Sequence, residues 1–294
     1  MLETVAALGA IVAPVYLTVG LGFLWVRTGQ AFPRDAIARL IMQIGAPCLA
    51  FSHLVAAQVS PEAMVRMLGA TLAALLTFLV VGAAILRALR LPMAPYLGSL
   101  AFGNTGNMGM PICLLAFGEP GLALAVCFFA ATASAHFSVG VLISSGRIGA
   151  AELLRTPLLL SVVAAALVIG LGATVPGWLL RATTLLGDSA IPLMQLALGA
   201  SLATLELRGL GRPAALGALR LGLGVAVGVG LASLMDLEGV ARGVFILDCA
   251  MPPAVLNYLL AERYGQRPEE VASLVMSSTL LAFVTLPVLL AFVR

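Results

Sequence analysis

The chain has 294 residues, of which 61 % are apolar and only 10 % are charged, and its mean hydropathy is +1.10. A soluble domain has roughly 45–50 % apolar and about 25 % charged residues, so this chain has too few charges to cover a water-exposed surface. The composition excludes soluble enzymes, and a net charge of +3 does not indicate a nucleic-acid partner.

Ten apolar runs are long enough to cross a bilayer, which takes about 20 mostly apolar residues per helix. We number them spans 1 to 10; they cover residues 4–26, 36–57, 65–86, 94–117, 121–144, 157–175, 183–205, 215–235, 240–261 and 271–293. The connections are short and prolines stand in or beside them, so no soluble domain fits between the spans. We therefore expect an all-α membrane protein with ten transmembrane helices.

The 16 basic residues are all arginines, and they are distributed unevenly between the two sets of loops. Twelve lie in the loops and adjoining helix ends after spans 1, 3, 5, 7 and 9, whereas the other side holds Arg66, Arg181, Arg242 and Arg294. Because cytoplasmic loops carry the excess of basic residues, the first set is expected in the cytoplasm. Both termini are then expected on the extracytoplasmic side.

Weak self-similarity at an offset of 147 residues divides the chain into two repeats, 1–147 and 148–294. The offset relates span 4 to span 9 and span 5 to span 10, and it pairs Gly118 with Gly265 and Thr132 with Thr279. Each repeat holds five spans, an odd number, so the second must cross the membrane with the opposite polarity. Inverted repeats of this kind are typical of secondary transporters.

Spans 4 and 9 are interrupted at related places. Residues 103–111 of span 4 contain three glycines, two asparagines and Pro111, and residues 248–253 of span 9 end in two consecutive prolines. Such backbone is a poor helix, and at membrane depth it survives only when it is buried in protein or lines a wet cavity. Paired interruptions indicate a transport site, although small-residue patterns can also serve helix packing alone.

The interruptions predict how a ligand would be held. The N-terminal end of a half-helix presents unpaired N–H groups and the positive end of the helix dipole, which suits a carboxylate. Neither interrupted span has a basic residue in its middle, so an anion would be bound by amides and dipoles. The neutral hydrogen-bonding side chains beside the breaks are those of Asn104, Thr105, Asn107 and Asn257.

The motif GNTGNMGMP in span 4, followed by LLAFGEPGLALA, resembles the signature of the auxin efflux carrier family. The region MPPAVLNYLLAERYG…VASLVMSSTLLAFVTLP is similar to the C-terminal pattern of that family, and the likeness covers the whole chain in length and layout. The family includes plant PIN-FORMED auxin exporters and bacterial permeases for malonate, malate and other small carboxylates. Only residues 145–156 stand where many plant members have a long cytoplasmic loop, so the chain resembles a compact bacterial member of the inner membrane.

The resemblance implies two inverted five-helix repeats in which the broken spans 4 and 9 cross at mid-membrane. Spans 1, 2, 6 and 7 would form a panel, and spans 3, 4, 5, 8, 9 and 10 a core that moves against it. Related architectures also allow a homodimer. The crossover residues that the resemblance assigns to substrate binding are Asn104, Thr105, Gly106, Asn107, Pro111, Pro252, Pro253 and Asn257.

Two ionisable residues inside the spans are candidates for coupling. Asp248 directly precedes the break in span 9, where it could carry a proton, accept hydrogen bonds from span 4, or pair with Arg242. His136 in span 5 shares a helix face with Thr132 and could relay a proton or make a packing hydrogen bond. These two residues favour a proton over sodium as the coupling ion. His53, near the outer end of span 2, is expected at the membrane interface.

Further polar or kinking residues are candidates for lining the transport cavity from either side. They are Gln43 and Pro47 in span 2, Gln195 in span 7 beside Pro192, and Thr132 in span 5. Interhelical hydrogen bonding is the alternative role for these residues.

The leading hypothesis is a secondary active transporter that moves a small organic anion, such as malonate, malate or an auxin-like acid, by alternating access. The four cysteines stand singly in apolar runs and no nucleotide-binding GxxxxGK[ST] occurs, so no metal, disulfide or cofactor is expected. A sodium-coupled symporter of the bile-acid type is an alternative, as is a membrane receptor. An intramembrane enzyme would need a nucleophile–base pair or paired carboxylates, for which no motif is present.

Overall fold

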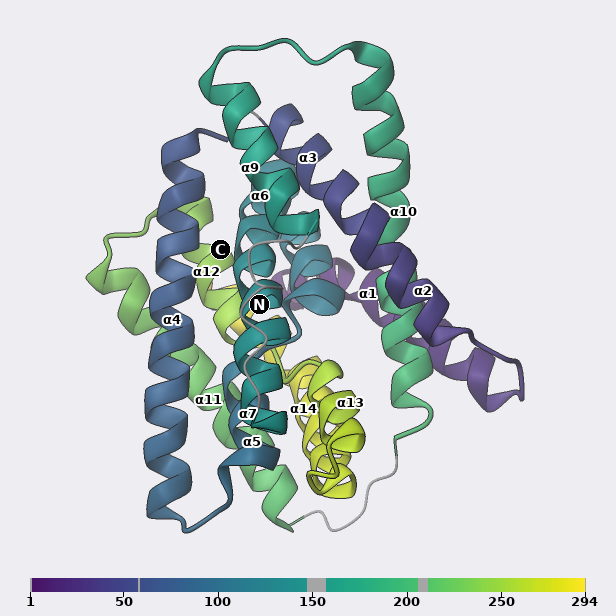
Figure 1. Ribbon diagram of the computed structural model, residues 1–294, viewed down its shortest axis with the longest axis vertical. Coiled ribbons are helices and arrows are strands. Elements are labelled where there is room, and N and C mark those ends of the chain that lie inside the picture. The colour runs from purple at the N-terminus through teal and green to yellow at the C-terminus, as the bar shows by residue number, and fades with distance from the viewer. Residues whose placement is uncertain (1, 58, 147–156, 206–210, 294) are drawn as a thin grey trace.

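The computed structural model describes residues 2–57, 59–146, 157–205 and 211–293, and in these ranges the chain forms helices and an isolated β-bridge but no strand (Figure 1). The α-helices are α1 Leu2–Arg27, α2 Arg34–Leu40, α3 Ala46–Ala56, α4 Pro61–Ala88, α5 Met93–Ala101, α6 Met110–Ala135, α7 Val141–Ser145, α9 Pro157–Gly170, α10 Gly177–Leu202, α11 Gly211–Leu234, α12 Gly239–Cys249, α13 Leu256–Arg263 and α14 Pro268–Val293. Three five-residue π-helical turns interrupt them: η1 Ile41–Gly45, η2 Thr105–Gly109 and η3 His136–Gly140.

Six helical segments of the described chain are long and apolar enough to cross a membrane, so the protein is a multi-pass membrane protein. They are Arg34–Ala56, Pro61–Ala88, Thr105–Ser145, Gly177–Leu202, Gly211–Leu234 and Pro268–Val293. The third segment bends at Gly118, whose φ of 68° ends one helix before Pro120 begins the next, so it contains the end of span 4 and all of span 5. Span 6 is shorter than expected, because α9 ends at Gly170 before Gly172, which has a φ of 62°.

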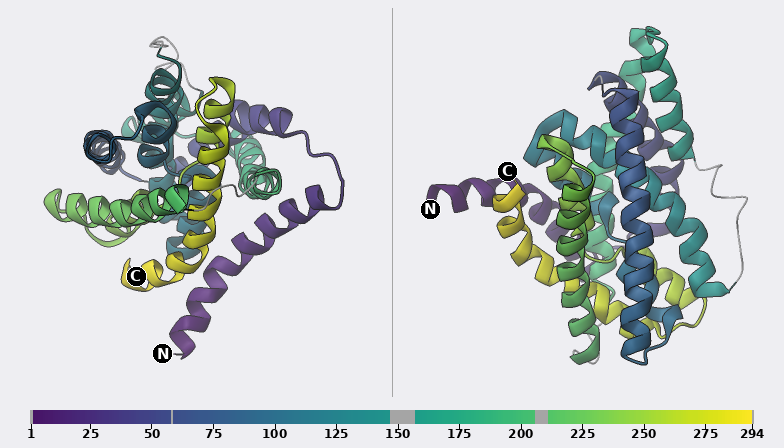
Figure 2. Two further views of the ribbon diagram at one scale, coloured as in Figure 1. Left: turned by 90° about the horizontal axis from the view of Figure 1, so that it is seen from below. Right: turned by 90° about the vertical axis from the view of Figure 1, so that its left-hand side faces the viewer.

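The helices pack in two sets of neighbours. Helix α10 lies against α1 and α3, and α3 also lies against α9, whereas α11 packs on α12 and α14 and α6 packs on α4 and α12. Close crossing of α1 and α10 depends on glycine, since a Cβ at Gly22 would lie 2.2 Å from the Leu196 carbonyl oxygen and one at Gly199 would lie 1.9 Å from that of Val19. Both views in Figure 2 show the first turns of α1 extending away from the other helices.

The two predicted interruptions meet. Helix α5 ends at Ala101 and α12 ends at Cys249, and the segments that follow them run antiparallel for a short distance. The Asn104 N–H donates to the Pro252 carbonyl at 2.7 Å, and the Ala254 N–H donates to the Phe102 carbonyl at 3.1 Å. Pro252 and Pro253 have no N–H to satisfy, which suits a bridge this short. Each break thus supplies hydrogen-bond partners that the other needs at membrane depth.

Arg220 of α11 reaches this junction and is only 1 % exposed. Its Nη1 donates to the Cys249 carbonyl at 2.9 Å, which places a cation at the C-terminal end of α12, and its guanidinium carbon lies 4.5 Å from the Phe78 ring centroid. A Cβ at Gly103 would lie 2.9 Å from Arg220 Nη2, so glycine makes room for the side chain.

Arg220 is one of the twelve arginines that the sequence analysis placed in the loops and adjoining helix ends after spans 1, 3, 5, 7 and 9, and its placement at a helix end is wrong. Helix α11 begins at Gly211, nine residues earlier, and nine residues of helix carry Arg220 about 14 Å inward. The number of arginines expected on the arginine-rich side therefore falls from twelve to eleven.

We predict that Arg220→Met lowers the stability of the protein in detergent by about 2–4 kcal/mol, because the buried Cys249 carbonyl loses a charged donor and Phe78 loses its cation. Thermal unfolding can be followed with a thiol-reactive fluorophore, since Cys113, Cys127 and Cys249 are buried in the folded protein. The matched control is Arg87→Met, which removes an exposed arginine from the last turn of α4. Equal unfolding temperatures for the two variants would show that Arg220 does not support the junction.

Candidate functional site

A cavity of about 810 Å³ leads from one end of the molecule to the junction of the two breaks. Its outer part is lined by the exposed residues Arg34, Thr204 and Glu262, and its inner part by the half-buried Asn107 and Phe129. The walls come from α2, α6, α10, α13 and the turns η1, η2 and η3. In Figure 1 this group of elements includes the lower part of α10 and α13.

Asn107 is the one predicted substrate-binding residue that lines this cavity. It lies in η2, the first turn of the half-helix that continues into α6, where Met108 and Gly109 donate to the Asn104 carbonyl, each at 3.2 Å. The N–H groups of the preceding residues begin this half-helix and have no carbonyl within it to bind. The other seven residues of the predicted set are buried in the junction: Asn104, Thr105, Gly106, Pro111, Pro252, Pro253 and Asn257.

Gly106 lets the half-helix approach the cavity wall. A Cβ at this position would lie 2.7 Å from Phe129 Cε2, and Phe129 lines the cavity beside Asn107. The glycine therefore allows the start of the half-helix to pack directly against Phe129.

Asp248 is 1 % exposed, and neither of its carboxylate oxygens has a hydrogen-bond partner among the described residues. Its carboxylate lies against η2, since a Cβ at Gly109 would be 2.1 Å from Oδ1. The alternative pairing with Arg242 is wrong, because Arg242 is directed to Ser233 Oγ, 3.3 Å from its Nη1, and that contact is exposed. Asn104 Nδ2 and Thr132 Oγ1 are also buried without a hydrogen bond in the described chain.

His136 and Asn257 join the two halves of the junction. Nε2 of His136 lies 3.1 Å from Asn257 Oδ1, and Asn257 Nδ2 donates to the carbonyls of Phe102 at 3.2 Å and Ala254 at 2.9 Å. Since Oδ1 can only accept, the His136 Nε2 carries the hydrogen. The imidazole also stacks on Phe102, with ring centroids 4.3 Å apart. This arrangement matches the packing hydrogen bond that was one of the two sequence hypotheses for His136.

The polar residues expected along the cavity lie elsewhere. Gln43 is exposed and Gln195 is buried, and the cavity is lined by their neighbours Met42 and Met194. Neither Pro47 nor Thr132 lines it. Gln43 lies in the π-helical turn η1, and a π turn shifts the residues that follow it out of α-helical register, which the sequence pattern does not reveal.

The side chain of His53 is only 10 % exposed and contacts two carboxylates, and its expected position at the membrane interface stays a prediction. Its Nδ1 lies 2.5 Å from Glu119 Oε2 and its Nε2 lies 2.9 Å from Asp188 Oδ1. The three residues line a recess of about 470 Å³ together with Ser52, Thr184 and Pro192. The sequence contained a signal for this cluster, since all three ionisable residues stand near the predicted outer ends of spans 2, 4 and 7.

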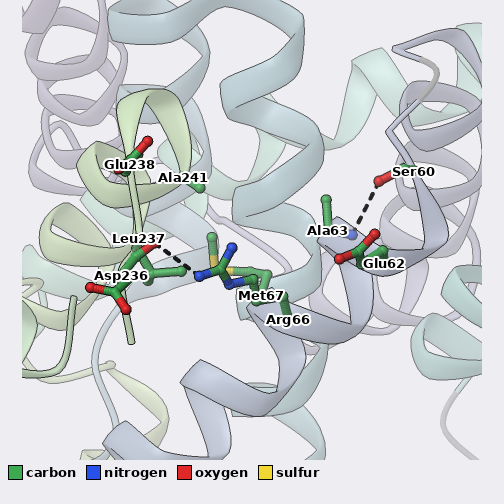
Figure 3. A pocket seen from close by; sticks show the side chains of 9 residues that line it. All are labelled: Ser60, Glu62, Ala63, Arg66, Met67, Asp236, Leu237, Glu238 and Ala241. Carbon is green, nitrogen blue, oxygen red and sulfur yellow. Dashed lines mark hydrogen bonds between the residues drawn. The ribbon is translucent and has the colours of Figure 1, made fainter. Parts of the chain in front are cut away.

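A further recess of about 440 Å³ lies between the start of α4 and the loop that joins α11 to α12 (Figure 3). Arg66 Nη2 donates to the carbonyls of Met235 at 2.7 Å and Asp236 at 2.9 Å, and Ser60 Oγ caps α4 by accepting from the Ala63 N–H. Asp236 has a φ of 50°, so Arg66 holds the carbonyls of a sharp turn. This recess does not include a residue of the junction, and the cavity at Asn107 is the candidate site.

Comparison with known proteins assigns the chain to a family. The sequence matches the family described as membrane transport protein over residues 9–151 and 141–290. Two similar proteins are uncharacterized transporters from Methanocaldococcus jannaschii, 26 % identical over 187 residues, and Methanothermobacter thermautotrophicus, 30 % identical over 199 residues. The aligned regions cover 60 % and 64 % of this chain and 61 % and 64 % of the relatives, less than two thirds of the length of each. The chain therefore belongs to the membrane transport protein family, which confirms the resemblance to auxin efflux carriers seen in the span 4 motif.

Proposed function

We propose that the protein is a secondary active transporter of a small organic anion, which binds beside Asn107 and crosses the membrane by alternating access. The observation that carries the proposal is the cavity of about 810 Å³ that extends from exposed residues at one end to the junction of the broken helices. Membership of a membrane transport family supports the general class of function. The substrate class is inferred from the chemistry of the cavity.

That chemistry favours an anion. Arg34 and Arg39 line the outer part of the cavity, and Arg34 Nη1 donates to Thr204 Oγ1 at 2.8 Å, which directs the guanidinium toward α10. At the inner end, the Asn107 amide and the start of the half-helix offer neutral donors. Asp35 and Glu262 line the same cavity, so its charge is mixed. A carboxylate could pair with Arg34 or Arg39 near the entrance and would be bound by neutral donors at the junction, without a permanent ion pair.

The architecture proposed for this function has ten spans in two inverted repeats, 1–147 and 148–294. Gly118 and Gly265, related by the offset of 147 residues, have φ values of 68° and 67°, and Pro120 and Pro268 follow them closely. The paired breaks agree with the same symmetry. We propose that spans 1, 2, 6 and 7 form a panel and the other six spans a core, a grouping that the packing of α10 on α1 and α3 and of α3 on α9 supports. The boundary between the repeats lies outside the described residues.

We further propose that Asp248 holds the coupling ion, by preference a proton and otherwise sodium. A buried carboxylate without a hydrogen-bond partner is costly when charged, so binding of a cation or proton there would relieve a large penalty. Asp248 lies against η2, the same turn that carries Asn107, so occupation of one position can affect the other. The proposed location is a bacterial inner membrane, with the arginine-rich loops in the cytoplasm and both termini on the extracytoplasmic side. This arrangement is compatible with a homodimer.

We expect proteoliposomes to take up labelled malonate, and Asn107→Ala to lower kcat/KM by about 10- to 100-fold, the value of one hydrogen bond to a charged group. The matched control is Gln43→Ala, which removes an amide that is exposed outside the cavity. If wild-type uptake is absent, other carboxylates would be tested in the same assay. Full uptake by Asn107→Ala would move the substrate site away from the junction.

We expect Asp248→Asn to abolish the acceleration of uptake by an inward proton gradient, while substrate exchange without a gradient persists, because the amide cannot exchange the proton. Uptake is measured with an inward proton gradient, an inward sodium gradient or neither. Asp236→Asn, in an exposed turn, is the matched control and should retain the gradient response. A response to sodium alone in the wild type would favour the bile-acid-type alternative, and an unchanged proton response in Asp248→Asn would exclude this residue as the coupling site.

A further inference from the structure

His53 joins three separate elements at one end of the molecule. It lies on α3, Glu119 lies at the corner in α6 between Gly118 and Pro120, and Asp188 lies on α10. The side chain of His53 is 10 % exposed, whereas those of Glu119 and Asp188 are 55 % and 57 % exposed. The imidazole is therefore enclosed between two carboxylates that face solvent in the recess.

This cluster and the cavity at Asn107 lie at opposite ends of the same helices. On α10, Asp188 lines the recess and Ser201 lines the cavity, thirteen residues or about 20 Å of helix away. The chain from α2 to α3 follows the same pattern, with Arg34 at the cavity and His53 at the recess. The cavity thus approaches the junction from one end, and the His53 cluster connects the same helices at the other.

Hydrogen bonding makes this contact dependent on a proton. Both imidazole nitrogens face a carboxylate oxygen, and an ionised carboxylate can only accept. Both nitrogens donate only when the ring is protonated, whereas a neutral ring turns one lone pair toward a carboxylate. The ring can therefore donate to both carboxylates at once only when both of its nitrogens carry hydrogen.

Among the described residues, few titratable or charged groups face His53 from the elements packed around it. Helix α9 packs on α3 and has no titratable residue between Pro157 and Gly170. On α3 itself, the titratable residue nearest to His53 is Cys48. The Cys48 carbonyl accepts a hydrogen bond from Ser52 Oγ. The arginine of α10 is Arg181, which stands seven residues before Asp188 in the sequence. From α6, Glu119 is the ionisable residue that contacts His53.

We propose that His53, Glu119 and Asp188 form a proton-dependent latch that holds the extracytoplasmic end of the transport pathway closed. The latch rests on the proposed alternating-access function. Because its carboxylates face solvent at that end, it responds to the pH of the extracytoplasmic side, and acid there favours the conformation in which the cavity at Asn107 is open to the other side. It is separate from Asp248, which is buried at the junction.

The test measures distances between spin labels on either side of the latch, in proteoliposomes without substrate. Labels are placed on cysteines introduced at the exposed Leu115 of α6 and Ser189 of α10, with Cys48 replaced by serine. Raising the pH from 5.5 to 8.5 is expected to increase a longer-distance population, by at most tenfold per pH unit, the limit for a single proton. This measurement does not depend on transport, so failure of the latch and failure of the proposed substrate are distinguishable.

Substitutions at His53 separate the latch from other effects of pH. His53→Gln, which has no exchangeable charge, is expected to remove the pH dependence, whereas His53→Arg keeps two donors at every pH and is expected to keep the short distance up to pH 8.5. Glu238→Gln, at an exposed carboxylate outside the cluster, should leave the response unchanged. A wild-type distance that does not change with pH, or a full response retained in His53→Gln, would overturn the proposal.

Discussion

The architecture depends on the hydrogen bonds that two interrupted helices make to each other. The N–H groups of Asn104 and Ala254 donate to the carbonyls of Pro252 and Phe102, between apolar helices of the described chain. Without these bonds, polar backbone groups of both breaks would be buried in hydrocarbon at a cost of several kcal/mol each. The pairing therefore places two half-helix ends at one point, and it brings Asn107 to the inner end of the cavity.

Two buried ionisable side chains near this junction, those of Arg220 and Asp248, differ in their hydrogen bonding. Arg220 donates to the Cys249 carbonyl and lies over Phe78, so its charge stabilises the end of α12. Asp248, one residue before Cys249, has no hydrogen-bond partner among the described residues. The guanidinium of Arg220 thus has a hydrogen-bond acceptor at a helix C-terminus, whereas the Asp248 carboxylate has no described hydrogen-bond partner beside the turn that carries Asn107. The first arrangement stabilises the end of α12, and the second is the observation on which the proposed coupling role of Asp248 rests.

Several features were predictable from the sequence because they depend on composition and local backbone chemistry. Membrane insertion follows from the low charge and the long apolar runs, and the breaks follow from the glycines and prolines at residues 103–111 and 248–253. The family resemblance came from the same short motif. The interruption of spans 4 and 9 could be inferred from these local signals, but the signals did not distinguish Asn107, which lines the cavity, from the seven other predicted residues, which are buried.

Other features were decided by tertiary structure alone. The sequence pattern does not say that Arg220 turns inward to Cys249, that Met42 and Met194 line the cavity in place of Gln43 and Gln195, or that His53 meets Glu119 and Asp188 across three elements. Each of these contacts joins residues far apart in the chain, and helix rotation and the π-helical turns determine which faces meet. The sequence by itself determined which segments enter the membrane and where they break, whereas only packing decided which side chains meet there.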